Sequence, residues 1–173
     1  MAKQEKPKIS LETIKKVKPE ILLKLINKAK EHLKTDEVMQ RICKEYDQSV
    51  DMIDLIPTTF KDLDVSAKTD HGVVYLNYKL LEDGDFLKDY SYLIHEYSHF
   101  FQQCFMSKPT KGADDGEYLD NPYEIEGFVN QIEYIANELG EDEAHDYVDD
   151  LLDHHDIDDK EKDDKKETLM ARV

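Results

Sequence analysis

The sequence predicts an α+β domain that is mostly helical, with a small β-sheet of two to four strands beside its longest buried helix. Apolar residues recur at three- and four-residue spacing over most of the chain, which is typical of amphipathic helices. One stretch, 73–78, is rich in β-branched and aromatic residues and lies between two turn-like sequences, so we expect a strand there. The length of 173 residues, 39% of them hydrophobic, suffices for one core of modest size and excludes two large domains.

Two helices are expected in the N-terminal part of the domain, at about residues 10–56. Pro19 stands at the first helical position of an apolar stripe of about four turns. A second stripe begins near Val38 and continues until Pro57 interrupts it. Residues 60–66 are a weaker strand candidate, because their apolar residues do not alternate regularly.

Two further helices have clear boundaries. The first runs from Phe86 to about Met106 and is expected to be mostly buried. The second begins at Pro122, because Asn121 is a favourable N-cap and proline is favourable at the first helical position. Gly140 ends this helix.

The C-terminal part is acidic. A last helix is expected at about residues 142–155. Residues 156–173 are poor in apolar side chains, which predicts a disordered tail. The predicted organisation is therefore one domain over residues 1–155, followed by this tail.

Charge and cysteine content narrow the class of protein. The chain carries 40 Asp and Glu against 23 Lys and Arg, a formal net charge of -17, so neither nucleic acid nor an anionic membrane is expected as a partner. No stretch approaches the roughly 20 apolar residues that cross a bilayer, and no apolar secretory signal follows the first lysines, which favours a cytoplasmic location. Cys43 and Cys104 are too few for a disulfide framework, and we expect both to be buried.

The sequence His95-Glu96-Tyr97-Ser98-His99 is an HExxH motif inside the helix expected at 86–106. Residues four apart in a helix project from the same face, so the two imidazoles can converge on one Zn²⁺ ion. A carboxylate beside the metal can accept the proton of an activated water molecule and pass it to a leaving amine. The motif therefore predicts zinc-dependent hydrolysis of peptide bonds with Glu96 as the general base.

A catalytic zinc site needs a third protein ligand, and the next helix offers two candidates, Glu124 and Glu126. Glu124 lies nearer the apolar stripe of that helix, which favours it as the ligand. Two alternatives stay open: Glu126 is the ligand, or Glu124 forms a capping box with Asn121.

The segments HEYSHFFQQ and NPYEIEGF together resemble the gluzincin branch of the zincin metallopeptidases, in particular the small single-domain minigluzincins. The resemblance covers about residues 69–140. It implies a zincin-like fold in which a strand runs along the cleft above the motif helix, and a peptide or protein substrate that pairs with this strand in extended form. It also implies zinc ligands His95, His99 and Glu124, general base Glu96, and a small-residue position at Gly127.

The chain departs from the family pattern at Phe128, where an Asp that orients a ligand histidine is common. This departure supports a second hypothesis, a catalytically inactive zinc-binding protein that acts as a peptide-binding or interaction module. Four other histidines are expected to face solvent and are not assigned to the site: His71, His145, His154 and His155.

Overall fold

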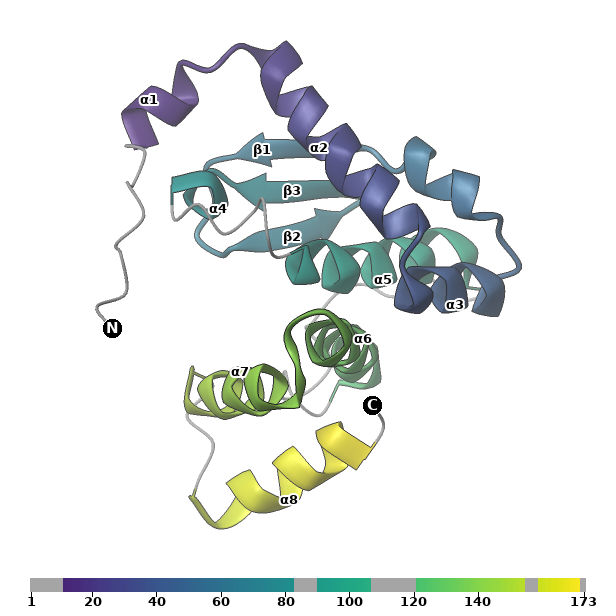
Figure 1. Ribbon diagram of the computed structural model, residues 1–173, viewed down its shortest axis with the longest axis vertical. Helices are drawn as coiled ribbons and strands as arrows, with labels where there is room; N and C mark the ends of the chain where they lie inside the picture. Colours follow the sequence, from purple (N-terminus) through teal and green to yellow (C-terminus); the bar gives the residue numbers. More distant parts are fainter. Residues whose placement is uncertain (1–10, 83–89, 107–120, 155–158, 172–173) are drawn as a thin grey trace. The chain divides into compact units, whose positions relative to one another are not determined.

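The computed structural model describes residues 11–82, 90–106, 121–154 and 159–171 (Figure 1). Most of these residues are helical and three short strands form one mixed sheet, so the predicted α+β class is confirmed. Within the described ranges, no helix combines the length and the apolar character needed to cross a membrane.

Contacts between residues divide the chain into two compact units, Met1–Tyr92 and Leu93–Val173, where the sequence predicts one domain over 1–155. The difference arises because the N-terminal helices contact one another and the sheet, whereas the last three helices bury their apolar faces on one another. Apolar periodicity shows which face of a helix is buried, but not which partner covers it.

The first unit begins with helices, as expected. They are α1 (Leu11–Lys15), α2 (Pro19–Lys34), α3 (Glu37–Glu45) and the 3₁₀ helix η1 (Val50–Leu55). Pro19 opens α2, and Asp36 caps α3 by accepting hydrogen bonds from the backbone N–H groups of Val38 and Met39. The second predicted helix is interrupted because Asp47 adopts a left-handed backbone conformation, with φ of 55°.

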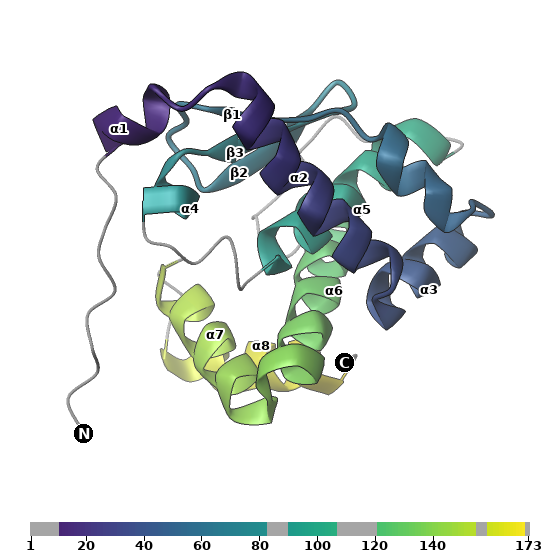
Figure 2. The same cartoon turned by 45° about the horizontal axis from the view of Figure 1, so that its top comes forward.

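The sheet of the first unit contains β1 (Thr58–Lys61), β2 (Ala67–Asp70) and β3 (Val73–Asn77) in the order β1-β3-β2. The strand predicted at 73–78 is confirmed as β3, which pairs in parallel with β1 and antiparallel with β2. Helix α2 contacts β1 and crosses one face of the sheet in both views (Figures 1 and 2). The short helix α4 (Lys79–Glu82) follows β3.

The second unit contains most of α5 (Ser91–Phe105), with α6 (Pro122–Leu139), α7 (Glu141–His154) and α8 (Asp159–Ala171). The predicted boundaries of α6 are confirmed: the Asn121 side chain accepts a hydrogen bond from the Tyr123 N–H at 3.0 Å, and Gly140 ends the helix with φ of 103°. Helices α6, α7 and α8 share one apolar cluster: Phe128, Val129, Ile132, Ile135, Ala144, Val148, Leu151, Leu152 and Leu169.

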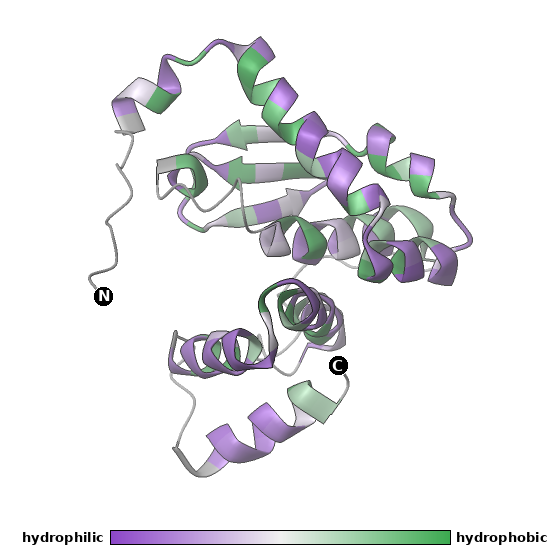
Figure 3. Ribbon diagram, in the orientation of Figure 1, coloured by the Kyte–Doolittle hydropathy of each residue, from purple (hydrophilic) through white to green (hydrophobic). Residues whose placement is uncertain are grey.

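Helix α8 replaces the disordered tail that the sequence predicts. It is hydrophilic along most of its length and apolar at its C-terminal end (Figure 3). Leu169 is 5% exposed within the apolar cluster, and two exposed ion pairs, Lys162–Asp153 at 2.6 Å and Lys166–Asp149 at 2.8 Å, join α8 to α7. The average composition of the tail predicts disorder because it does not show that one leucine, Leu169, is placed to anchor an otherwise polar helix.

Candidate metal centre

Helix α5 carries both motif histidines on one face. His95 and His99 are four residues apart, and their ring centroids lie 4.8 Å apart. The helix is otherwise strongly apolar and largely buried, so the histidines and Glu96 are held in surroundings from which water is mostly excluded. His95 and Glu96 are 5% and 7% exposed, respectively. Such polar groups need specific partners to offset the loss of hydration.

A buried hydrogen-bond chain joins α6 to α5. The Asn130 side-chain amide donates to Ser98 Oγ at 3.0 Å, and the Ser98 hydroxyl donates to the Ile94 carbonyl oxygen at 2.8 Å. All three residues are at most 2% exposed. Because buried polar groups must be paired, these two hydrogen bonds define how α6 is placed along α5.

That placement brings Glu124 to the two histidines. Glu124 Oε2 lies 3.2 Å from His95 Nε2 and 3.3 Å from His99 Nε2, and the two Nε2 atoms lie 3.1 Å apart. Around a tetrahedral ion with ligand distances of about 2.0–2.1 Å, neighbouring ligand atoms lie about 3.3 Å apart. The three donor atoms therefore have the mutual spacing of one face of a tetrahedral site.

The donor types also fit a metal ion. Two imidazole nitrogens and a carboxylate oxygen are a ligand set typical of catalytic zinc sites, which keep a fourth position open. The same donors also suit other divalent transition metals, so they do not identify zinc. The His95, His99 and Glu124 group can hold a divalent metal ion.

Charge is coupled strongly within the group. Burial disfavours the charged form of His99, but the hydrogen bond and negative charge of Glu124, with smaller contributions from Glu96 and Gln102, raise the pKa of His99 to about 9. Burial likewise opposes ionisation of Glu124, yet the hydrogen bonds from His95 and His99 lower its pKa. The negative charge of the Glu124 carboxylate is thus neutralised by a proton on the His99 imidazole, and a bound cation would take the place of this proton.

Glu126 lies elsewhere. Its Oε2 atom accepts a hydrogen bond from Gln102 Nε2 at 3.0 Å, and it does not belong to the group of converging ligand atoms. The Glu124 carboxylate contacts the histidines, so the capping-box alternative does not describe it either. Sequence reasoning missed Gln102, whose signal was its position three residues after His99, on the same face of α5.

Packing holds the ring of His95. Gly127 lies directly beneath the ring, and the Phe128 ring packs against it with a centroid distance of 4.5 Å. The prediction of a small residue at Gly127 thus has a steric basis. Among the described residues, nothing pairs with the buried Nδ1 atom of His95, which agrees with the expected effect of Phe128 in place of a carboxylate.

The remaining histidines described lie outside this group. His71 occupies a turn with φ of 49°, its side chain is 95% exposed, and His145 on α7 is exposed, both as expected. His155 and the side chain of His154 lie outside the described part of the chain.

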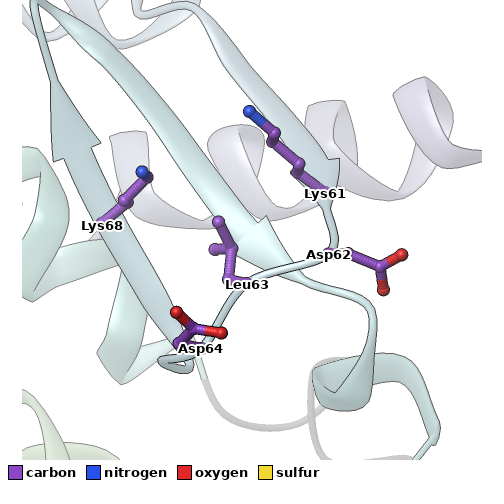
Figure 4. Close-up of a pocket in the computed structure, with 5 residues that line it drawn as sticks. All are labelled: Lys61, Asp62, Leu63, Asp64 and Lys68. Atoms are coloured by element: carbon purple, nitrogen blue, oxygen red, sulfur yellow. The ribbon is translucent and has the colours of Figure 1, made fainter.

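A separate hollow lies in the first unit, at the loop between β1 and β2 (Figure 4). The Nζ atoms of Lys61 and Lys68 lie 5.2 and 5.7 Å from the centre of the Tyr75 ring, and Asp62 pairs with Lys15 at 2.7 Å. The lysines and aspartates that line the hollow balance in charge, and its lining contains neither histidine nor cysteine, so it is a weaker candidate than the metal centre. The lining residues are Lys61, Asp62, Leu63, Asp64 and Lys68.

Compared with protein-family models, curated proteins and solved structures, this chain gives no match in any of the three. The candidate chemistry therefore depends on the residues of the site itself: three converging side chains that could bind a metal ion, with the buried carboxylate of Glu96 on the helix of the two histidines.

Proposed function

We propose that this protein is a zinc-dependent peptidase with a zincin-like site. The observation that supports this most strongly is the convergence of His95 Nε2, His99 Nε2 and Glu124 Oε2 to within 3.1–3.3 Å of one another. The HExxH motif adds Glu96, whose negative charge is near enough to raise the pKa of His99. A ligand triad and an adjacent carboxylate are the two parts that metal-assisted hydrolysis requires.

Each residue has a distinct role in this proposal. His95, His99 and Glu124 would hold the ion, which would supply the Lewis acidity for activating water and polarising the carbonyl group. Glu96 accepts the proton of the attacking water and then donates it to the leaving amine. Because Glu96 is 7% exposed, its carboxylate acts where bulk water competes little for that proton.

Metal analysis and one variant test this proposal together. Purified wild-type protein should contain about one zinc per chain and should cleave an unstructured protein or a peptide library. Glu96→Gln should keep the zinc and lose cleavage by at least about a hundredfold, the lower end of the range for general acid–base catalysis. Cleavage at the wild-type rate by Glu96→Gln would overturn the assignment.

A second candidate function is a zinc-binding protein that holds a peptide without cleaving it. Phe128 packing on His95, together with the unpaired Nδ1 atom of His95 among the described residues, favours this candidate, because a carboxylate partner usually strengthens a ligand histidine. Equimolar zinc, peptide binding that depends on zinc, and no cleavage of any library member would support it over the peptidase.

A further inference from the structure

Gln102 links His99 to the first turn of α6. It lies one turn after His99 on α5 and is fully buried, with 0% exposure. Its Oε1 atom lies 2.8 Å from His99 Nδ1. Its Nε2 atom donates to the Tyr123 carbonyl oxygen at 3.1 Å and to Glu126 Oε2 at 3.0 Å.

These contacts determine the orientation of the Gln102 amide. The Tyr123 carbonyl and the Glu126 carboxylate are both acceptors, so the NH₂ group of Gln102 must face them. Its carbonyl oxygen is then left facing His99 Nδ1. An oxygen can only accept there, so Nδ1 of His99 must carry the hydrogen.

We infer that Gln102, held by Glu126 and Tyr123, is a positioning residue that fixes His99 in the Nδ1–H tautomer and directs its Nε2 lone pair at the metal. This inference rests on the proposed function, because the metal site gives the tautomer its purpose. It assigns Glu126 to the support of a ligand instead of to the metal itself.

The Glu126 carboxylate strengthens this support in two ways. A hydrogen bond to a charged acceptor is stronger than one between neutral groups, so Gln102 has little freedom to rotate. Polarisation also passes along the chain from carboxylate to amide to imidazole, and a partner that accepts from the distal nitrogen makes the ligand nitrogen more basic.

The same amide also ties both ligand helices together. Gln102 belongs to α5, and its NH₂ group binds the Tyr123 carbonyl, one residue before Glu124 on α6. The two histidines are thus supported differently: His99 by hydrogen bonds, and His95 by the packing of Gly127 and Phe128.

Gln102→Leu tests the inference, because it keeps similar volume and removes both hydrogen-bonding ends. Gln103→Leu is the matched control, since it makes the same change about 100° around the helix. Zinc affinity is measured by competition with a chelator. Metal-free protein labelled with ¹⁵N is also studied at pH 10, well above the ordinary imidazole pKa, where long-range ¹H–¹⁵N spectra report the His99 tautomer.

We expect wild-type protein and Gln103→Leu to show His99 protonated on Nδ1. Gln102→Leu should give a mixture of tautomers and bind zinc about 10- to 100-fold more weakly. Glu126→Gln should give a smaller loss, because its amide oxygen still accepts from Gln102 without the charge. This second variant also serves if Gln102→Leu fails to fold.

An Nε2–H tautomer in wild-type protein, or wild-type zinc affinity in both Gln102→Leu and Glu126→Gln, would overturn the inference. These outcomes differ from a failure of the proposed function, in which wild-type protein would bind no zinc. In that case the His99 tautomer of the metal-free protein would still show whether Gln102 acts on His99.

Discussion

A Cβ atom on Gly127 would lie 3.0 Å from Cε1 of His95, and 3.2 Å from each of the two ring nitrogens. The backbone of α6 therefore approaches the imidazole so closely that a Cβ atom at residue 127 would require the ring to shift by a few tenths of an ångström. Glycine suits this position because it has no side chain, and not because of its backbone freedom, since residue 127 lies within a regular helix.

Gly127→Ala should weaken zinc binding by about tenfold or more, because ligand side chains must be held to within about half an ångström. The same change favours the helix by about 0.5–1 kcal/mol, so lower helix propensity cannot explain the loss. Zinc affinity by chelator competition measures the effect. Asn137→Ala, at an exposed position of α6, is the control and should bind as wild type does. Unchanged affinity in Gly127→Ala would show that the ring moves without consequence.

Glu124→Gln should lower zinc affinity by more than the roughly 10- to 100-fold that a supporting residue costs, because it removes the charge of a proposed direct ligand. Zinc content after dialysis and chelator competition measure the loss. Glu138→Gln, at an exposed position near the end of α6, removes the same charge and should have little effect. A larger loss in Glu126→Gln than in Glu124→Gln would reverse the assignment of the third ligand.

Zinc affinity should depend on pH over an unusual range. The pKa of His99 is about 9 in the metal-free protein, so below that pH zinc must displace a proton. The affinity should therefore fall by about tenfold per pH unit between pH 8.5 and pH 7, and occupancy should be nearly lost at pH 4.5. An imidazole with an ordinary pKa of about 6.5 would give a flat profile above pH 7. Affinity measured at several pH values, corrected for the chelator, distinguishes the two.

The two cysteines should react at very different rates. Cys43 is 1% exposed and burial raises its pKa to about 11, whereas Cys104 is exposed, contrary to the expectation that both are buried. At pH 8 about one Cys43 thiol in a thousand is ionised, and thiolate is the reactive form. Alkylation followed by mass spectrometry should label Cys104 first and Cys43 only after unfolding. Equal labelling in native protein would mean that the first unit opens readily.

Leu169→Ala should lower the free energy of unfolding by about 2–4 kcal/mol, because it removes a buried side chain that anchors α8. Lys166→Ala removes only an exposed ion pair and should cost less than about 1 kcal/mol. Urea denaturation measures both. Equal effects of the two variants would show that α8 contributes little packing.

Much of the fold was predictable from local patterns. The strand at 73–78, the helix from Pro122 and the turn at His71 follow from residue preferences that act over a few positions. The break at Asp47 was missed, because the apolar stripe continues across it while the backbone leaves the helix. Helix α8 was missed because its stability depends on a surface that other helices provide.

The candidate site, like the fold, has a part that local sequence determines and a part that depends on tertiary packing. The sequence alone determined that His95 and His99 share one face with Glu96 beside them, since positions within one helix are related by its fixed geometry. Only the tertiary structure decided that Glu124 joins them, that Glu126 binds Gln102 instead, and that Gly127 lies against His95. These outcomes depend on how far α6 is shifted along α5 and on its rotation, and both are determined by side-chain packing and buried hydrogen bonds between the helices.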